Sequence, residues 1–259
     1  MPFTLAHPAA VLPLRRVRLL RTIPLIIGAM SPDVPYYLPW RIAKHIPPIT
    51  HTFRGTFTLC LPIGMALLGF CWLLRNVLVA PLWASARAKC LRAIERFGEQ
   101  PVNWVLAPLS ILIGAWSHIA WDSFTHADGW MVRRVSALSA PVTIGSYTGQ
   151  LCHVLQYASS VFGLAVLAVW FLRMPTPEQP GREGLHPAGS AFLMAVLVAI
   201  ATGVGTYDTL RHLQPHDTAR YHLLYLLLTR TVAWFALLHT VTGTGLLLTR
   251  RSRVAPEPG

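Results

Sequence analysis

Five long apolar runs constrain the fold of this chain more than any other feature of its sequence. They cover about Gly55–Leu78, Trp104–Trp121, Val154–Leu172, Ala188–Thr206 and Leu223–Leu248. Each is long enough to cross a hydrocarbon layer roughly 30 Å thick as a helix. Because one soluble core could not hide this much apolar surface, the runs predict five transmembrane helices. We therefore expect an all-α, polytopic helical membrane protein.

The composition agrees with a membrane protein and excludes a disordered one. Only 12% of the 259 residues are charged, against roughly 25% in soluble domains, and 53% are hydrophobic. The segment Ile23–Met30 is apolar but too short to cross, and the turn-forming Ser31-Pro32-Asp33 follows it. It predicts a short N-terminal re-entrant or interfacial helix.

No internal repeat divides the chain, so residues 1–249 are predicted to form a single helical membrane domain. The basic, proline-containing segment 250–259 is predicted to be a disordered tail. In the N-terminal segment the basic residues follow the apolar stretch, so we expect no cleaved signal peptide.

The net charge is +12, which in a soluble protein would raise the question of nucleic-acid binding. Here Lys and Arg lie mainly between the apolar runs, where they contact anionic lipid. No basic stripe is interleaved with stacking aromatic residues. We expect membrane lipid as a partner and no nucleic acid. Lys and Arg are nearly equal in number on the two sides, so the orientation is not predicted.

The predicted topology sorts the acidic residues by type. All five aspartates fall on the side that holds residues 1–54, and all five glutamates fall on the opposite side. Nine of the eleven histidines lie on or next to the aspartate side. Short, rigid Asp and His side chains are typical of a fixed polar centre.

The string SHIAWDSFTHADGW carries the clearest chemical signal, because His118, Asp122 and His126 follow one another at intervals of four. Each interval rises about 6 Å along a helix, so the three side chains lie on one slowly turning stripe. His118 and Asp122 can hold one ion together. His126 can join only if the helix ends after Asp122 or if a second metal lies beyond the shared carboxylate. The nearby Gly129 favours a helix end.

Each member of this stripe also has a structural explanation. His118 could stabilise a buried helix end, Asp122 could be an interfacial carboxylate, and His126 could be exposed. Three such groups at membrane depth would be costly without a ligand, which favours a metal site. Interfacial tryptophans place that site at headgroup depth; they are Trp116, Trp121 and Trp130.

Three further candidate ligands lie on the same predicted side. Asp33 is flanked by Pro32 and Pro35, which restrict the backbone and fix its carboxylate in a turn. His51 begins the first span, where a neighbouring threonine could cap the helix. His7 precedes a proline, a position suited to the start of a short helix. Turn formation, capping and simple exposure are the respective alternatives.

Several of these strings together resemble a known family. MPFTLAHPAAVLPLRR, SPD, THT, HIAWDSFTHADGW and LQYASSVFGL are similar to the bacterial membrane-protein family called domain of unknown function 4184, over roughly residues 1–172. The resemblance implies a metal-site core in residues 1–172, with additional spans in 173–249. The family is similar to predicted metal-dependent hydrolases of the bacterial cytoplasmic (inner) membrane, which implies a multi-pass protein of that membrane.

A more distant resemblance is to the zinc-dependent phospholipase C and single-strand nuclease superfamily. Its order of ligands falls on these positions: His7, Asp33, His51, His118, Asp122, His126 and His153. Two features depart from that pattern: Met1-Pro2 stands where those enzymes use an N-terminal tryptophan, and Tyr157 stands where a carboxylate follows their last histidine. The resemblance therefore supports at most a pair of metal ions.

Together these observations predict a membrane-bound hydrolase that uses one or two divalent ions, zinc or alternatively manganese. The predicted catalytic residues are His118, Asp122 and His126, and the predicted substrate is a phosphoester of a lipid or a lipid-linked molecule. Candidate substrate-binding residues are Arg133, Arg134 and Arg230. The first two could instead bind lipid headgroups without a role in catalysis. Arg230 lies inside the last span, where it could pair with an aspartate or meet an anionic substrate.

Two other classes of function remain open from the sequence. The same His and Asp residues could form the binding site of a metal-ion transporter or sensor, although a fixed positive charge such as Arg230 is unusual beside a cation path. Alternatively, the polar residues could satisfy one another in a non-catalytic membrane scaffold, which predicts no stoichiometric metal.

Overall fold

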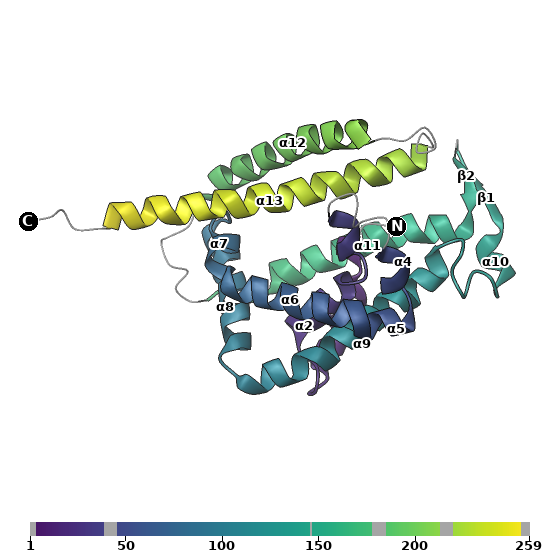
Figure 1. Cartoon of the computed structure of the whole chain (residues 1–259), viewed down its shortest axis with the longest axis horizontal. Coiled ribbons are helices and arrows are strands. Elements are labelled where there is room, and N and C mark those ends of the chain that lie inside the picture. The colour runs from purple at the N-terminus through teal and green to yellow at the C-terminus, as the bar shows by residue number, and fades with distance from the viewer. Residues whose placement is uncertain (1–3, 39–45, 146, 178–184, 213–219, 255–259) are drawn as a thin grey trace, which may run out of the picture. The chain divides into compact units, whose positions relative to one another are not determined.

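The computed structural model describes residues 4–38, 46–145, 147–177, 185–212 and 220–254. In this part of the chain five helices are long and apolar enough to cross a membrane (Figure 1). They span Phe53–Leu73, Pro101–Thr125, Leu151–Arg173, Pro187–His212 and Leu223–Thr249. Strands β1 (Pro141–Ile144) and β2 (Tyr147–Gln150) form an antiparallel hairpin in which Pro141 pairs with Gln150. The prediction of an all-α, multi-pass membrane protein is confirmed.

The ends of the spans differ in places from the sequence prediction. The first was expected to reach Leu78, but helix α6 (Leu61–Leu73) ends because Leu74 leaves the helical conformation, and a separate helix α7 (Arg75–Val79) follows. The last helix, α13 (Arg220–Val254), continues into the segment predicted to be a disordered tail. Residues 255–259 of that tail lie outside the described residues.

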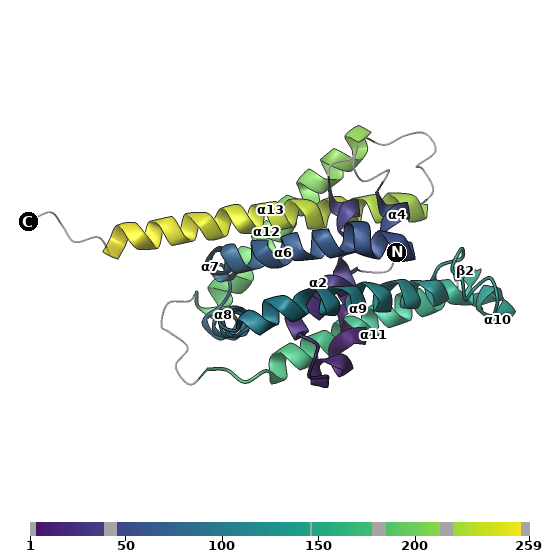
Figure 2. The same ribbon diagram turned by 60° about the horizontal axis from the view of Figure 1, so that its bottom comes forward.

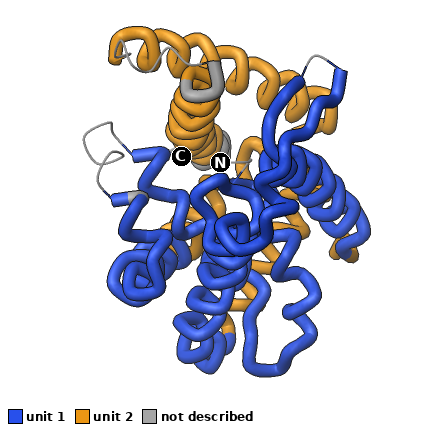
Figure 3. The backbone as a smooth tube through the Cα atoms, turned by 90° about the vertical axis from the view of Figure 1, so that its right-hand side faces the viewer, with its two compact units in different colours: residues 1–69, 100–174 blue, residues 70–99, 175–259 orange. Residues whose placement is uncertain are grey.

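The contacts divide the chain into two compact units, which Figure 3 shows in different colours. Unit 2 holds residues 70–99 and 175–259. It contains α7, the amphipathic helix α8 (Ala84–Gly98), α12 (Pro187–His212) and α13. The imidazole of His239 on α13 contacts the carbonyl of Leu78 at 2.7 Å, which joins α13 to the end of the α7 segment.

Unit 1 holds residues 1–69 and 100–174. Its N-terminal part consists of short helices: η1 (Thr4–Ala6), α1 (Pro8–Val11), η2 (Leu12–Arg16), α2 (Thr22–Met30) and η3 (Val34–Tyr37). Helix α4 (Pro47–Thr50) precedes the first span, which is built from α5 (Phe53–Gly55), the π-helical turn η4 (Thr56–Cys60) and α6. The long helices α9 (Pro101–Thr125) and α11 (Leu151–Arg173) complete the unit, and α10 (Ser136–Ser139) and the hairpin connect them at one end of the pair (Figure 2).

Helix α2 packs against the middle of α9. Gly28 lies against the backbone of Ile111, and Gly114 lies against the backbone of Leu25, so a Cβ atom at either glycine would overlap a carbonyl oxygen of the other helix. Small residues allow this close approach between helices in membrane proteins. Most of α2 is buried, so the short helix predicted here is packed within unit 1.

The segment before α2 is also packed into unit 1. Val11, Leu25 and Ala29 form a buried cluster, and Leu14, Leu20 and Ile113 surround it. Close packing of this kind stabilises the fold through many van der Waals contacts. The N-terminal helices are therefore anchored against α2 and α9, and the polar residues that they carry are held in place.

Candidate metal centre

Two of the predicted ligands occupy fixed positions at the starts of short helices. His7 is the N-cap residue of α1, and Pro8 takes the first helical position, as its sequence context predicts. Asp33 precedes η3, and its backbone N–H donates to the carbonyl of Met30. Proline at the start of a helix preorganises the backbone, so both side chains leave the chain in a defined direction.

His51 lies just before the first span, where a threonine cap was predicted. Thr52 is the N-cap residue of α5, and its hydroxyl accepts a hydrogen bond from the N–H of Gly55 at 3.0 Å. The hydroxyl of Thr50 donates to the carbonyl of Pro32 at 2.7 Å and lies 3.3 Å from Nδ1 of His51. Because that hydroxyl proton is used, Thr50 accepts from Nδ1–H, which leaves Nε2 of His51 as the basic nitrogen.

His118 and Asp122 lie one turn apart on α9, and both are buried. Nδ1 of His118 lies 2.8 Å from the carbonyl oxygen of Ala29, at the end of α2. A carbonyl oxygen can only accept, so Nδ1 donates its proton to Ala29, and Nε2 is the nitrogen that faces the centre. A backbone partner of this kind fixes the imidazole for metal binding. The close packing of α2 on α9 thus orients the ligand.

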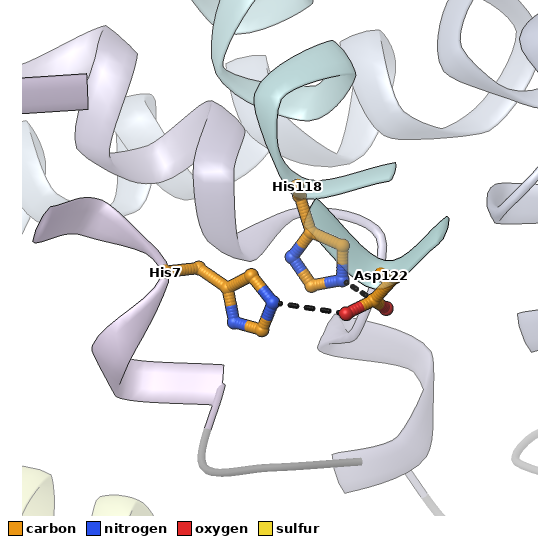
Figure 4. A group of neighbouring side chains, drawn as sticks. All are labelled: His7, His118 and Asp122. Carbon is orange, nitrogen blue, oxygen red and sulfur yellow. Dashed lines mark hydrogen bonds and ion pairs between the residues drawn. The ribbon is translucent and has the colours of Figure 1, made fainter. Parts of the chain in front are cut away.

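The basic atoms of these residues converge (Figure 4). Nε2 of His118 lies 3.2 Å from Oδ2 of Asp122, and Nε2 of His7 lies 3.1 Å from Oδ1 of the same carboxylate. The rings of His7 and His118 stack with their centres 3.8 Å apart.

A second set of contacts joins Asp33 and His51 to the same place. Oδ1 of Asp33 lies 3.3 Å from Nε2 of His51 and 3.6 Å from Nε2 of His118. Nε2 of His51 lies 3.7 Å from Oδ2 of Asp122. Two groups of three in the described chain could therefore hold a metal ion, and they share His118: the first is His7, His118 and Asp122, and the second is Asp33, His51 and His118.

Burial leaves some of these atoms unsatisfied. Asp33 and His118 are fully buried, and neither Oδ1 of Asp33 nor Nε2 of His118 has a hydrogen-bond partner among the described residues. Buried polar atoms without partners are rare and costly in folded proteins. A cation between these atoms would satisfy both, so the residues fit a divalent metal.

The charge of Asp33 is favoured in spite of its position. Burial by itself would raise the pKa of the Asp33 carboxyl, but the adjacent imidazoles of His118 and His51 outweigh burial and hold that pKa below its ordinary value. Asp33 is therefore an anion at neutral pH, as a metal ligand must be.

A chain of hydroxyl groups fixes the second oxygen of Asp33. The hydroxyl of Tyr37 donates to Oγ1 of Thr4 at 2.6 Å, and Thr4 donates to Oδ2 of Asp33 at 2.8 Å. This leaves Oδ1 directed to the histidines. Sequence reasoning missed Thr4 and Tyr37 because only the folded chain brings them to Asp33.

His126 lies at the edge of the centre. Helix α9 ends at Thr125, so the side chain of His126 turns back, and its Nδ1 lies 3.5 Å from Oδ1 of Asp122. Its Nδ1–H donates to the carbonyl of Asp122 at 3.2 Å, while Nε2 accepts from the amide of Gln156 on α11 at 3.2 Å. Burial lowers the pKa of His126, so this ring is neutral at pH 7. It belongs to neither group of three.

Four predicted site residues remain: His153, Arg133, Arg134 and Arg230. His153 on α11 belongs to neither group of potential ligands. Arg133 and Arg134 are exposed, and the guanidinium of Arg134 stacks on the ring of Trp130 at 4.0 Å. Arg230 is buried within unit 2.

Comparison with known proteins identifies the family of the chain and nothing more specific. The family model described as "Domain of unknown function (DUF4184)" matches residues 1–244. The match extends beyond the resemblance drawn over residues 1–172 and reaches the last span. No curated protein and no solved structure matches the chain significantly. The chain belongs to the DUF4184 family.

Proposed function

We propose that this DUF4184 protein is a membrane-bound, metal-dependent hydrolase that cleaves a phosphoester of a lipid or lipid-linked substrate. The observation that carries the proposal is the convergence of His7, Asp33, His51, His118 and Asp122 from three separate parts of the chain. Nε2 of His118 and Oδ1 of Asp33 are buried and lie in ion-pair contact with their neighbours but form no hydrogen bond among the described residues, which a bound cation would explain.

The spacing of the donor atoms supports a small divalent ion. Ligand atoms about 2.0 Å from a tetrahedral zinc ion are about 3.3 Å from one another. The contacts of Asp122 with His118 and of Asp33 with His51 are 3.2 and 3.3 Å. Imidazole nitrogen and carboxylate oxygen are also the ligands that zinc prefers, with manganese as the alternative.

Asp122 is suited to serve one ion or two. Its Oδ2 faces His118 and His51, whereas its Oδ1 faces His7 and His126. Since the Nδ1 of His118 is occupied by Ala29, His118 can bind only one ion, through Nε2. A second ion would therefore depend on Oδ1 of Asp122 and on His7.

The chain's own residues position the reaction, and a bound divalent ion supplies Lewis acidity that activates water and polarises a phosphoryl oxygen. Asp33, His51 and His118 would hold this ion at a fixed position. His126, braced by Gln156, packs beside the carboxylate of Asp122, with its Nδ1 3.5 Å from Oδ1. In the overall reaction water adds to phosphorus, the ester P–O bond breaks, and the released alcohol takes a proton.

Access to the centre fits a reaction at a membrane surface. The side chains of His51 and His126 are each 24% exposed, whereas His118 is fully buried, so substrate would approach past the first two. The exposed Arg133 and Arg134 are candidate anchors for a phosphate. We assign the protein to the bacterial inner membrane on the basis of the family resemblance.

The test is metal content together with turnover in purified, full-length protein. Protein stripped with a chelator and reloaded with zinc or manganese should hydrolyse bis(4-nitrophenyl) phosphate. His118→Ala and Asp122→Ala should each lose both the metal and the activity. His153→Ala is the matched control, because His153 belongs to neither ligand group and its replacement should change neither quantity.

Three results would count against the proposal. Hydrolysis that survives in His118→Ala and Asp122→Ala would remove the metal mechanism. Stoichiometric metal without turnover of phosphodiesters would favour a transporter or sensor. Protein that binds no metal when reloaded would favour a scaffold.

A further inference from the structure

A cavity of about 220 Å³ lies beside the candidate metal centre, within unit 1. Its walls come from η1 and α1, from Trp121 on α9, and from one face of α11. Gly163 of α11 allows this arrangement, because a Cβ atom there would lie 2.9 Å from the carbonyl oxygen of Ala6. The cavity is thus built by close packing of the N-terminal segment on a candidate membrane span.

The cavity and the metal centre share a side chain. His7 lines the cavity, and its Nε2 lies 3.1 Å from Oδ1 of Asp122. Trp121, another lining residue, directly precedes Asp122 in α9. A molecule bound in the cavity would therefore have one end next to the metal centre, where the proposed reaction occurs.

The two serine hydroxyls in the lining are already used in hydrogen bonds within the protein. The hydroxyls of Ser159 and Ser160 both donate to the carbonyl of Gln156, at 3.1 and 2.8 Å. The hydroxyl of Ser159 also accepts from the indole N–H of Trp121 at 3.3 Å. An ordered water needs two to four free polar partners, which this wall does not offer. The cavity consequently suits hydrocarbon better than water.

The lining includes side chains exposed on the apolar surface of the unit. Phe162 is 71% exposed and Trp121 is 42% exposed, and Ala10 is exposed as well. Phe162 lies on α11, which is long and apolar enough to cross the membrane. In a bilayer, the surroundings of such a helix are lipid chains.

We propose that this cavity binds a hydrocarbon chain of the substrate, so that the enzyme acts on single molecules drawn from the bilayer with their phosphoester at the metal centre. The inference rests on the proposed function and adds the part of the substrate that the protein recognises. A cavity of about 150 Å³ holds benzene, so by proportion 220 Å³ takes about eight or nine carbons. The Nδ1 of His7, buried and without a hydrogen-bond partner in the described chain, can donate to an oxygen next to the chain.

The proposal is tested by the dependence of turnover on chain length. Zinc-loaded, full-length protein in nanodiscs is given methyl 4-nitrophenyl phosphate or its octyl homologue. Ala10→Trp fills the cavity from an exposed position, and Ser160→Leu fills it from the buried wall. We expect each variant to lower kcat/KM for the octyl ester by about ten-fold or more, with the methyl ester unchanged. Val161→Trp is the control, because Val161 is exposed on α11 and does not line the cavity.

A second readout separates this proposal from the hydrolase proposal. A phospholipid with a diazirine in its acyl chain should label the peptide that holds η1 and α1 in wild type and in Val161→Trp, and much less in Ala10→Trp, with zinc content equal in all three. If wild type, Ala10→Trp and Ser160→Leu all prefer the octyl ester equally, the cavity does not bind the hydrocarbon chain, even if zinc-dependent turnover persists. If the zinc protein hydrolyses neither ester, the hydrolase proposal fails, and the labelling pattern alone decides whether a chain binds.

Discussion

At the scale of single residues, the candidate centre depends on neighbours that are not ligands. The carbonyl of Ala29 fixes the orientation of the His118 ring. The hydroxyl of Thr50 does the same for His51, and the hydroxyl of Thr4 does so for the carboxylate of Asp33. Each contact uses one polar atom of the ligand and directs the other atom to the centre. Outer contacts of this kind usually contribute 10–100-fold to metal affinity.

Asp33 gives a prediction with a definite pH dependence. Its pKa is held below the ordinary value of 3.8, so the stabilisation from its imidazole contacts is complete above that value and is lost only as the pH falls below it. Asp33→Asn should therefore weaken zinc binding by at least about ten-fold, and by a constant factor between about pH 5 and pH 8. Competition with a chromophoric chelator measures this ratio. A ratio that falls towards one on acidification within this range would show that Asp33 titrates there.

At the scale of elements, the packing of α2 on α9 decides the position of His118. Gly28 and Gly114 bring the two backbones together, and this places the carbonyl of Ala29 within 2.8 Å of the imidazole. The sequence shows both glycines in apolar segments, but it does not indicate that they face each other.

This packing predicts the effect of one added methyl group. Gly114→Ala puts a Cβ atom against the carbonyl of Leu25, so α2 must move away from α9. We expect a loss of about 1–3 kcal/mol in stability and about 10–100-fold weaker zinc binding. Chemical denaturation and the chelator competition measure the two quantities. Gly69→Ala is the matched control, since nothing lies within 4 Å of its new Cβ and it should leave both unchanged or slightly improved. Unchanged zinc affinity in Gly114→Ala would show that the packing of α2 on α9 does not control the metal centre.

At the scale of the whole molecule, the ligands join distant parts of unit 1. They come from the N-terminal helices, from the start of the first span and from the end of α9. Metal ions held by these ligand groups would cross-link the folded state and not the unfolded one.

Zinc should therefore raise the melting temperature of the detergent-solubilised protein. At free zinc 100 times the Kd the gain is roughly 2.7 kcal/mol, which for a chain of this length corresponds to roughly 5–11 °C. Differential scanning fluorimetry with and without zinc measures the shift. His118→Ala should show none, because it removes the residue that both ligand groups share. An equal shift in that variant would mean that zinc binds elsewhere.

The ligand types and the helical architecture were predictable because both depend on patterns of residues that lie close together in the sequence. Apolar runs predicted the five spans, and the i, i+4 spacing predicted that His118 and Asp122 face the same way. The surroundings of Pro8 and Thr52 predicted where two short helices begin. The contacts of Thr4, Tyr37 and Gln156 were not predictable, because they join segments 29 or more residues apart in sequence.

The sequence by itself determined that this protein is a multi-pass helical membrane protein with Asp and His at the ends of its apolar runs, because hydropathy and helix spacing act within a few turns. Only the tertiary structure decided which of these residues meet. It brought His7, Asp33 and His51 to α9, turned His126 back to the edge of the centre, and left His153 outside both ligand groups. The physical reason is that convergence depends on how closely α2, α9 and α11 approach one another, which is set by packing between segments distant in the chain.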